Sequence, residues 1–179
     1  MASTHTIHLG HIDTISMNQS PGLLFLRKFL PAVDSLDPNL GDYLSKFLAP
    51  KATFTINDND PIPFKDVLPM LQMRSKSLSK FSHHVHTAWD LENAATSLPE
   101  SKLSGKPGRT VMYESISVTV FKNDPEQMEV AVKEFNIIEL EESDSATGLQ
   151  AVELRTYMDK QPVMDRLAMI QKLNTEKSV

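Results

Sequence analysis

Three ionisable side chains fall on apolar faces of the strands that the sequence predicts: His83, Glu114 and Glu134. Side chains alternate between the two faces of a strand, so each of these residues shares a face with apolar neighbours. A carboxylate held away from water on such a face has its pKa raised toward neutrality. Beside a histidine, it can exchange protons with a bound carbonyl or hydroxyl group. We therefore predict an acid–base site suited to dehydration, double-bond migration or aldol-type cyclisation.

A structural role for the same residues stays open at this stage. A buried His or Glu in a strand is often a hydrogen-bonded or salt-bridged group, and Glu134 has Arg155 on the next predicted strand as a candidate partner. The face assignment is open as well. A β-bulge in the strand over residues 81–93 would reverse it and place His84 and His86 inside.

Four further residues are candidates for contact with a substrate: Trp89, Phe54, Tyr43 and Asn136. Trp89 shares the predicted inner face of His83, and Asn136 shares that of Glu134. Aromatic side chains such as Phe54 and Tyr43 are typical of a core or a pocket wall.

The histidine cluster 83, 84 and 86 does not predict a metal site. Adjacent residues of a strand point to opposite faces, so only His84 and His86 converge, which leaves the site short of ligands. We expect neither a metal nor a cofactor, because proton transfer between side chains requires none.

Composition restricts the kinds of partner. The 179 residues carry a net charge of −5, which disfavours binding to nucleic acids or to anionic membranes. The N-terminus lacks the features of a signal peptide, and no apolar run approaches the ~20 residues that span a bilayer. The chain has no cysteine, which fits a reducing compartment. We expect a cytoplasmic protein.

The chain divides into an arm, one domain and a tail. Residues 1–20 are polar and rich in Ser, Thr and His, so we expect a flexible arm whose role stays open. Residues 21–173 form a single domain, and residues 174–179 a C-terminal tail. Periodicity and turn residues predict helices beginning at Pro21 and covering about 39–48, 63–80 and 161–173, and strands over 52–56, 81–93, 109–122, 128–140 and 149–158.

This order of elements predicts an α+β fold. Runs of strands after runs of helices favour antiparallel pairing. Strands of this length curl, so we expect a cone-like curved antiparallel sheet wrapped around the N-terminal helices, with a pocket between them. The exposed sheet face and the C-terminal helix offer a surface for a homodimer.

The same plan resembles the NTF2-like superfamily, which includes SnoaL-like polyketide cyclases, ketosteroid isomerases and scytalone dehydratases. Residues 49–54 (Ala-Pro-Lys-Ala-Thr-Phe) resemble the entry to the first strand of that fold. Residues 133–135 (Lys-Glu-Phe) resemble the Asn-Glu-Tyr of SnoaL-like chains, and residues 156–159 match part of their last strand. The likeness covers about residues 21–160.

Two positions bear on the activity that this resemblance implies. Ile56 occupies the place of the catalytic base of ketosteroid isomerases and cannot take a proton, which argues against that reaction. The histidines at 83–86 match the place where a scytalone dehydratase carries a histidine. The resemblance implies a cofactor-free lyase, isomerase or cyclase acting on a small, apolar, oxygenated molecule such as a polyketide or a terpenoid. The alternative is a non-catalytic module of the same fold that binds a hydrophobic ligand or a protein.

Overall fold

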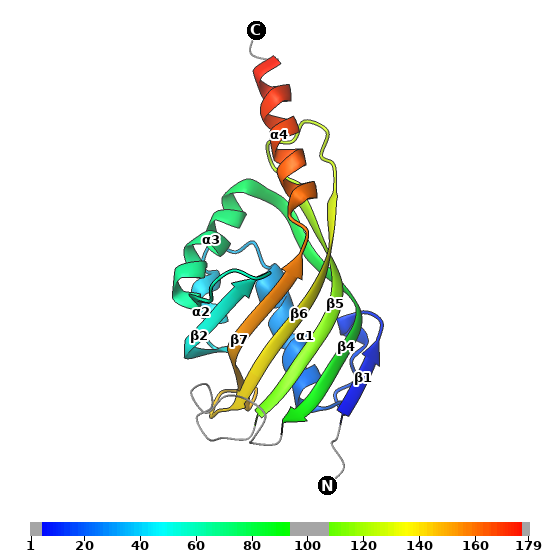
Figure 1. Cartoon of the computed structure of the whole chain (residues 1–179), viewed down its shortest axis with the longest axis vertical. Helices are drawn as coiled ribbons and strands as arrows, with labels where there is room; N and C mark the ends of the chain where they lie inside the picture. Colours follow the sequence, from blue (N-terminus) through cyan, green and yellow to red (C-terminus); the bar gives the residue numbers. More distant parts are fainter. Residues whose placement is uncertain (1–4, 94–107, 177–179) are drawn as a thin grey trace.

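The computed structural model describes residues 5–93 and 108–176, and within them the strands form one sheet (Figure 1). The strand order is β1-β4-β5-β6-β7-β2-β3. The strands are β1 (His5–Leu9), β2 (Leu48–Ile56), β3 (Ile62–Pro63), β4 (Leu78–Asn93), β5 (Gly108–Phe121), β6 (Val130–Glu142) and β7 (Leu149–Met158).

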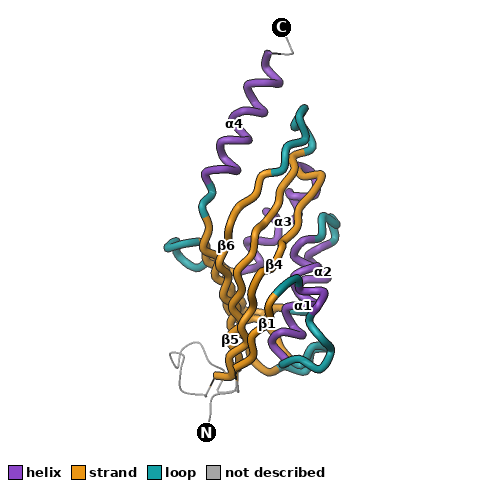
Figure 2. Tube along the Cα trace, turned by 90° about the vertical axis from the view of Figure 1, so that its right-hand side faces the viewer, coloured by secondary structure: helices purple, strands orange, loops and turns teal. Residues whose placement is uncertain are grey.

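The helices of the N-terminal half cover one face of this sheet (Figure 2). They are the 3-10 turn η1 (Ile12–Thr14), α1 (Pro21–Asp34), α2 (Leu40–Leu44) and α3 (Phe64–Ser77). The last helix, α4 (Gln161–Glu176), extends beyond the end of the sheet (Figure 1). The predicted α+β class, with N-terminal helices packed against a sheet, is confirmed.

Helix α1 supplies the centre of the core. Pro21 occupies its first turn, where the missing N–H costs nothing. Leu23, Leu26 and Leu30 recur on one side of the helix and are fully buried, because that side packs on the inner face of the sheet. This packing keeps the helix intact through Pro31. The helix ends at Asp34, and its end brings the Asp34 carboxylate to the sheet.

The sheet is mixed, which corrects the expected antiparallel pairing. The four long strands β4 to β7 pair antiparallel in chain order. Strand β2 instead pairs parallel with β7, so that Phe54 lies opposite Leu154. The sequence indicates hairpins between consecutive strands, but it carries no comparable signal for a strand that joins the sheet from between two helices.

The segment expected to be a flexible arm, residues 1–20, is described from His5 onward, and this part of it contains regular structure. Strand β1 pairs antiparallel with β4, with Thr6 opposite Asp90. Ile12 and Ile15 are buried in the main core. The segment contains few apolar residues, but both of these isoleucines contribute to the core. At the other end, α4 continues to Glu176, so the predicted tail begins within a helix.

A β-bulge between Val85 and Thr87 changes which side chains of β4 face inward. Before the bulge His83 and Val85 are buried, and after it Ala88 and Asp90 are. His84 and His86 are both exposed. The bulge therefore exists, but it lies too late in the strand to bring these two histidines inside.

Residues 94–107, which join the predicted strands over 81–93 and 109–122, lie outside the described part of the chain. Among the described residues, no helix combines the length and apolar character needed to cross a bilayer.

Candidate active site

A cavity of about 470 Å³ opens between α3 and the inner face of the sheet, within the range of small-molecule sites. Its wall is largely apolar. Phenylalanines and methionines dominate the lining, among them Phe29, Phe54, Phe64, Phe81, Phe121, Met70, Met73 and Met158. Val163 brings the first turn of α4 to the same wall. This lining suits a ligand with a large hydrocarbon surface.

His83 is the centre of the polar part of this wall. Its Nδ1 atom contacts the carboxylate of Asp34, and its backbone N–H donates to Asp34 Oδ2 at 2.9 Å. Its Nε2 atom lies 3.2 Å from Oε2 of Glu134. The side chains of His83 and Glu134 are 7% and 6% exposed. The end of α1, strand β4 and strand β6 thus place one imidazole between two carboxylates.

Hydroxyl and amide groups from the neighbouring strands complete the network. Ser117 Oγ donates to Glu134 Oε1 at 2.5 Å. Asn136, two residues along β6, accepts a hydrogen bond from Thr156 at 2.7 Å and donates to Ser115 at 3.3 Å. The inner face of the sheet therefore carries a continuous polar strip beneath the apolar walls.

The two carboxylates determine the protonation state of His83. Burial alone would lower its pKa, but the hydrogen bonds to Asp34 and Glu134 outweigh burial and raise that pKa to about 9. Burial also acts to raise the pKa of Glu134, but the hydrogen bonds from His83, Ser117 and Asn136 and the charge of His83 together outweigh burial and lower the pKa. At neutral pH the site is an imidazolium between carboxylates. The expected upward shift of the Glu134 pKa is wrong, because that expectation considered burial without the ion pair.

Tyr113 lies on the same wall and is buried. Burial raises the pKa of its phenol well above the usual value, and the charges of Glu134 and Asp34 add to that effect. The phenol therefore keeps its proton at all ordinary pH values and is available as a hydrogen-bond donor.

Four of the predicted site residues come together at the cavity: His83, Glu134, Phe54 and Asn136. Glu134 pairs with His83, and Arg155 bonds instead to Glu139 at 2.9 Å. The placement of His83, Glu134 and Asn136 agrees with their predicted strand faces, and Phe54 lies on the pocket wall. Their roles stay predictions.

Three predicted site residues lie elsewhere. Glu114 is exposed on the outer face of β5, whose inner face carries Tyr113 and Ser117. We expected the more apolar face of β5, which includes Glu114, to face inward. That face is instead the outer face of the sheet, which is also apolar. Trp89 lies beyond the bulge and packs against Phe135 on the outer face. Tyr43 is 50% exposed on α2, against Phe47.

Asp34, Tyr113 and Ser117 were missed by sequence reasoning. Asp34 ends α1, where a carboxylate is unfavourable beside the negative end of the helix dipole. An acid at that position therefore indicates a compensating cation, and His83 is that cation. No comparable signal marks Ser117, whose neighbours on its own face are small and polar.

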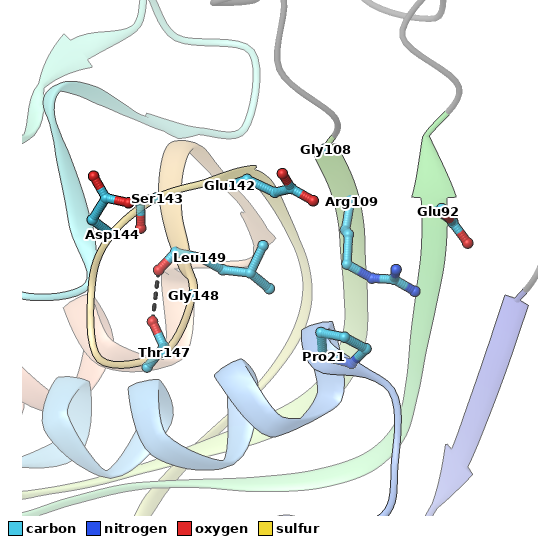
Figure 3. A pocket seen from close by; sticks show the side chains of 10 residues that line it. All are labelled: Pro21, Glu92, Gly108, Arg109, Glu142, Ser143, Asp144, Thr147, Gly148 and Leu149. Atoms are coloured by element: carbon cyan, nitrogen blue, oxygen red, sulfur yellow. Dashed lines mark hydrogen bonds between the residues drawn. The ribbon is translucent and has the colours of Figure 1, made fainter.

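A second hollow, of about 610 Å³, lies at the N-terminal end of α1 (Figure 3). Its wall is polar and includes the carboxylates of Glu92, Glu142 and Asp144. Its one guanidinium among the described residues, that of Arg109, is bound to Asp90 at 2.8 Å. This hollow lacks the apolar wall and the acid–base pair of the first cavity. No set of three or more His, Asp or Glu side chains in the described ranges is arranged to hold a metal.

Comparisons with known proteins bear on the fold. No family model and no curated protein matches the chain. Solved structures do match. A protein from Jannaschia sp. CCS1, described as a SnoaL-like polyketide cyclase, is 11% identical with a TM-score of 0.55, over 83% of this chain and 92% of its own.

Two more structures match in the same way. A protein from Novosphingobium aromaticivorans, described as a scytalone dehydratase, is 9% identical with a TM-score of 0.55, over 76% of this chain and 80% of its own. An NTF2-like superfamily protein from Salmonella enterica is 12% identical with a TM-score of 0.51, over 74% and 84%. Sequence identities this low support a shared architecture but not a shared activity. With helices α1 to α3 packed on a mixed sheet and these structural neighbours, the protein has the NTF2-like fold.

Proposed function

We propose that this protein is a cofactor-free lyase, isomerase or cyclase that transfers protons on a small molecule bound in the apolar cavity. The observation that carries the proposal is His83, held between Asp34 and Glu134 on the wall of an otherwise apolar cavity. Buried acid–base pairs of this kind are a common feature of catalytic sites.

Glu134 is the proton acceptor in this proposal. Its lowered pKa keeps it ionised, so it can remove a proton from a carbon next to a substrate carbonyl. His83 is the proton donor, because its raised pKa keeps it charged at neutral pH. Asp34 holds the ring in place and compensates its charge. Tyr113 and Asn136, on the same wall, are suited to hold a substrate oxygen by hydrogen bonds.

The substrate in this proposal is apolar and oxygenated, such as a polyketide or a terpenoid. The phenylalanine and methionine lining supports the apolar part. The descriptions of structural neighbours as a polyketide cyclase and a scytalone dehydratase support the class of chemistry. The acidic, cysteine-free chain further supports a cytoplasmic location.

Proton exchange at carbon provides a test that does not require the natural substrate. Hydrophobic ketones such as 2-tetralone and 4-chromanone are incubated with the protein in D2O, and loss of the α-proton signals is followed by NMR. The proposal expects faster exchange than in buffer, reduced by about 100-fold or more in Glu134→Gln. Glu139→Gln is the matched control, since Glu139 is a buried carboxylate of the same strand bonded to Arg155 and Thr110. Equal exchange rates in Glu134→Gln and Glu139→Gln contradict the proposal, and so does a wild-type rate no faster than that in buffer.

The second candidate is a non-catalytic module that binds a hydrophobic ligand or a protein. One observation favours it: both ring nitrogens of His83 already have carboxylate partners, as in a structural ion-pair network. This candidate expects ligand binding without proton exchange.

We also propose that two copies of the chain associate through the outer face of the sheet. Trp89 and Phe135 pack together on that face, with ring centroids 6.4 Å apart. Helices α1 to α3 cover the opposite face of the sheet (Figure 2). A paired aromatic cluster on an uncovered sheet face is typical of a protein–protein contact.

A further inference from the structure

Arg74 is a partly buried cation on the wall of the cavity, and the acid–base mechanism does not use it. It lies in the last turn of α3, and its Nη2 atom donates to the backbone carbonyl of Val33 at 2.8 Å. Its Cζ atom lies 4.4 Å from the centroid of the Phe81 ring. Its Nε atom is buried and has no hydrogen-bond partner.

The charge of Arg74 is incompletely compensated. Within the described residues no carboxylate lies within ion-pair distance of it. Burial lowers its pKa to about 10, and the more distant charges of Asp34 and Glu134 only partly oppose this. Those two carboxylates are bound to His83. A guanidinium with a buried N–H that has no partner is normally paired with an anion, because leaving such a group unpaired is unfavourable.

We propose that Arg74 binds the carboxylate of a hydrophobic organic acid, whose apolar body fills the cavity. A planar guanidinium recognises a carboxylate better than any other side chain does. Such a ligand would not meet a net negative wall, because Arg74 and His83 balance Asp34 and Glu134. The inference rests on the proposed function for the location of the site, but not for the reaction.

The geometry separates this anchor from the proton-transfer groups. The Phe81 ring has Arg74 over its face and the ring of His83 perpendicular to it, 5.1 Å between centroids. The carboxylate bound at Arg74 is therefore not the reacting group. A ligand held there extends its apolar body into the cavity, whose wall also carries Glu134.

Arg74 also joins the end of α1 to α3, so its substitution affects stability as well. Arg27 offers a matched control. Its Nη1 atom donates to the backbone carbonyl of Ile15 at 2.7 Å, and it lies outside the cavity lining. Arg27→Gln therefore removes a similar arginine–carbonyl bond without touching the cavity. Circular dichroism establishes that each variant is folded at the temperature of the binding measurement.

The test compares carboxylates with their neutral amides. Titration calorimetry at pH 7 measures 2-naphthoate against 2-naphthamide, 4-biphenylcarboxylate against its amide, and octanoate against octanamide. The proposal expects at least one acid to bind the wild type about 10-fold or more tightly than its amide, since a charge-assisted bond contributes 1.4 kcal/mol or more. Arg74→Gln should reduce that ratio to about twofold or less, and Arg27→Gln should leave it unchanged.

Three results overturn the proposal: no acid binds the wild type, each amide binds as tightly as its acid, or the preference survives in folded Arg74→Gln. If Arg74→Gln does not fold, Arg74→Lys keeps the charge but loses the planar fork, and the ratio should still fall by about threefold or more. The wild type separates the two proposals: an acid preference without proton exchange contradicts the proposed function alone, and proton exchange without an acid preference contradicts the anchor alone. Glu134→Gln should lose the exchange and keep the acid preference.

Discussion

The Nε2 atom of His83 lies 3.2 Å from Oε2 of Glu134, while its Nδ1 atom contacts Asp34 on the opposite side of the ring. One imidazole thus joins the end of α1 to the middle of β6. The charge on that ring stabilises the fold and also sets the protonation state of the cavity. Stability and acid–base behaviour are therefore linked through a single residue, and both can be followed by pH.

Stability should decrease as the pH rises from about 6.5 to about 9. The pKa of His83 is raised to about 9 in the folded protein, against an ordinary value near 6.5. The stabilisation is thus fully present below pH 6.5 and is lost as the pH passes 9, by ~3 kcal/mol in total. Urea unfolding at pH 6, 7.5 and 9.5 measures the change. The slope should be much smaller in His83→Gln, and an equal slope in both proteins would show that other groups cause it.

Glu134→Gln should lower the pKa of His83 and destabilise the fold moderately. The change removes one of the two carboxylates beside the imidazolium, but Asp34 remains. We expect a loss of about 1–3 kcal/mol, less than for a buried ion left without any partner. An NMR titration of the His83 ring together with urea unfolding measures both effects. An unchanged His83 midpoint would show that Glu134 does not hold the proton on the ring.

Gly22→Ala should destabilise the protein by about 2–3 kcal/mol. A Cβ atom at position 22 would lie 2.5 Å from the carboxylate of Asp90, which is fully buried. That carboxylate cannot move away easily, because it accepts bonds from the Gly22 N–H at 2.9 Å and from Arg109. Gly41→Ala is the control, since its nearest neighbour lies at 3.6 Å. Thermal melts should show a clear loss for the first change and none for the second.

Ile15→Ala should cost about 2–4 kcal/mol, as expected for a fully buried aliphatic residue. Ile15 is 1% exposed, although it belongs to the segment that the sequence indicates to be a flexible arm. Leu9→Ala is the control within the same segment, because Leu9 is 74% exposed. Equal melting temperatures for the two variants would show that the segment does not pack on the body in solution.

The protein should sediment at about twice its 20.1 kDa chain mass. Phe135→Lys places a charge on the outer face beside Trp89 and should give the monomer mass without loss of fold, because Phe135 does not face the main core. A wild-type monomer at micromolar concentration would contradict association through this face. A dimer that persists in Phe135→Lys would place the contact elsewhere.

The elements of this fold were predictable where one side of an element is clearly apolar. Strand β6 alternates regularly, and its inner face correctly includes Glu134 and Asn136. Strand β5 has apolar residues on both faces. The assumption that the more apolar face points to the core therefore predicted Glu114 at the site instead of Ser117. The failure has a physical cause: hydroxyl groups face the cavity, while the outer face carries hydrophobic side chains.

The candidate site was predictable in part for a related reason. Alternation placed His83 on the inner face correctly, but the bulge after Val85 moved Trp89 to the other face. The sequence carries no mark of that extra residue. Asp34 meets His83 across 49 positions of the chain, through the packing of α1 on the sheet. Such a contact depends on the assembled fold, not on local pattern.

The parallel pairing of β2 with β7 has a consequence during synthesis of the chain. The side chain of Asn57 bonds to both backbone groups of Met158, 101 positions later. A ribosome needs roughly 5–20 s to add that many residues. Throughout that interval β2 has left the ribosome without the strand that completes its hydrogen bonding. The nascent protein therefore carries an open strand edge until its last strand emerges, and this is the stage at which it most needs protection by a chaperone.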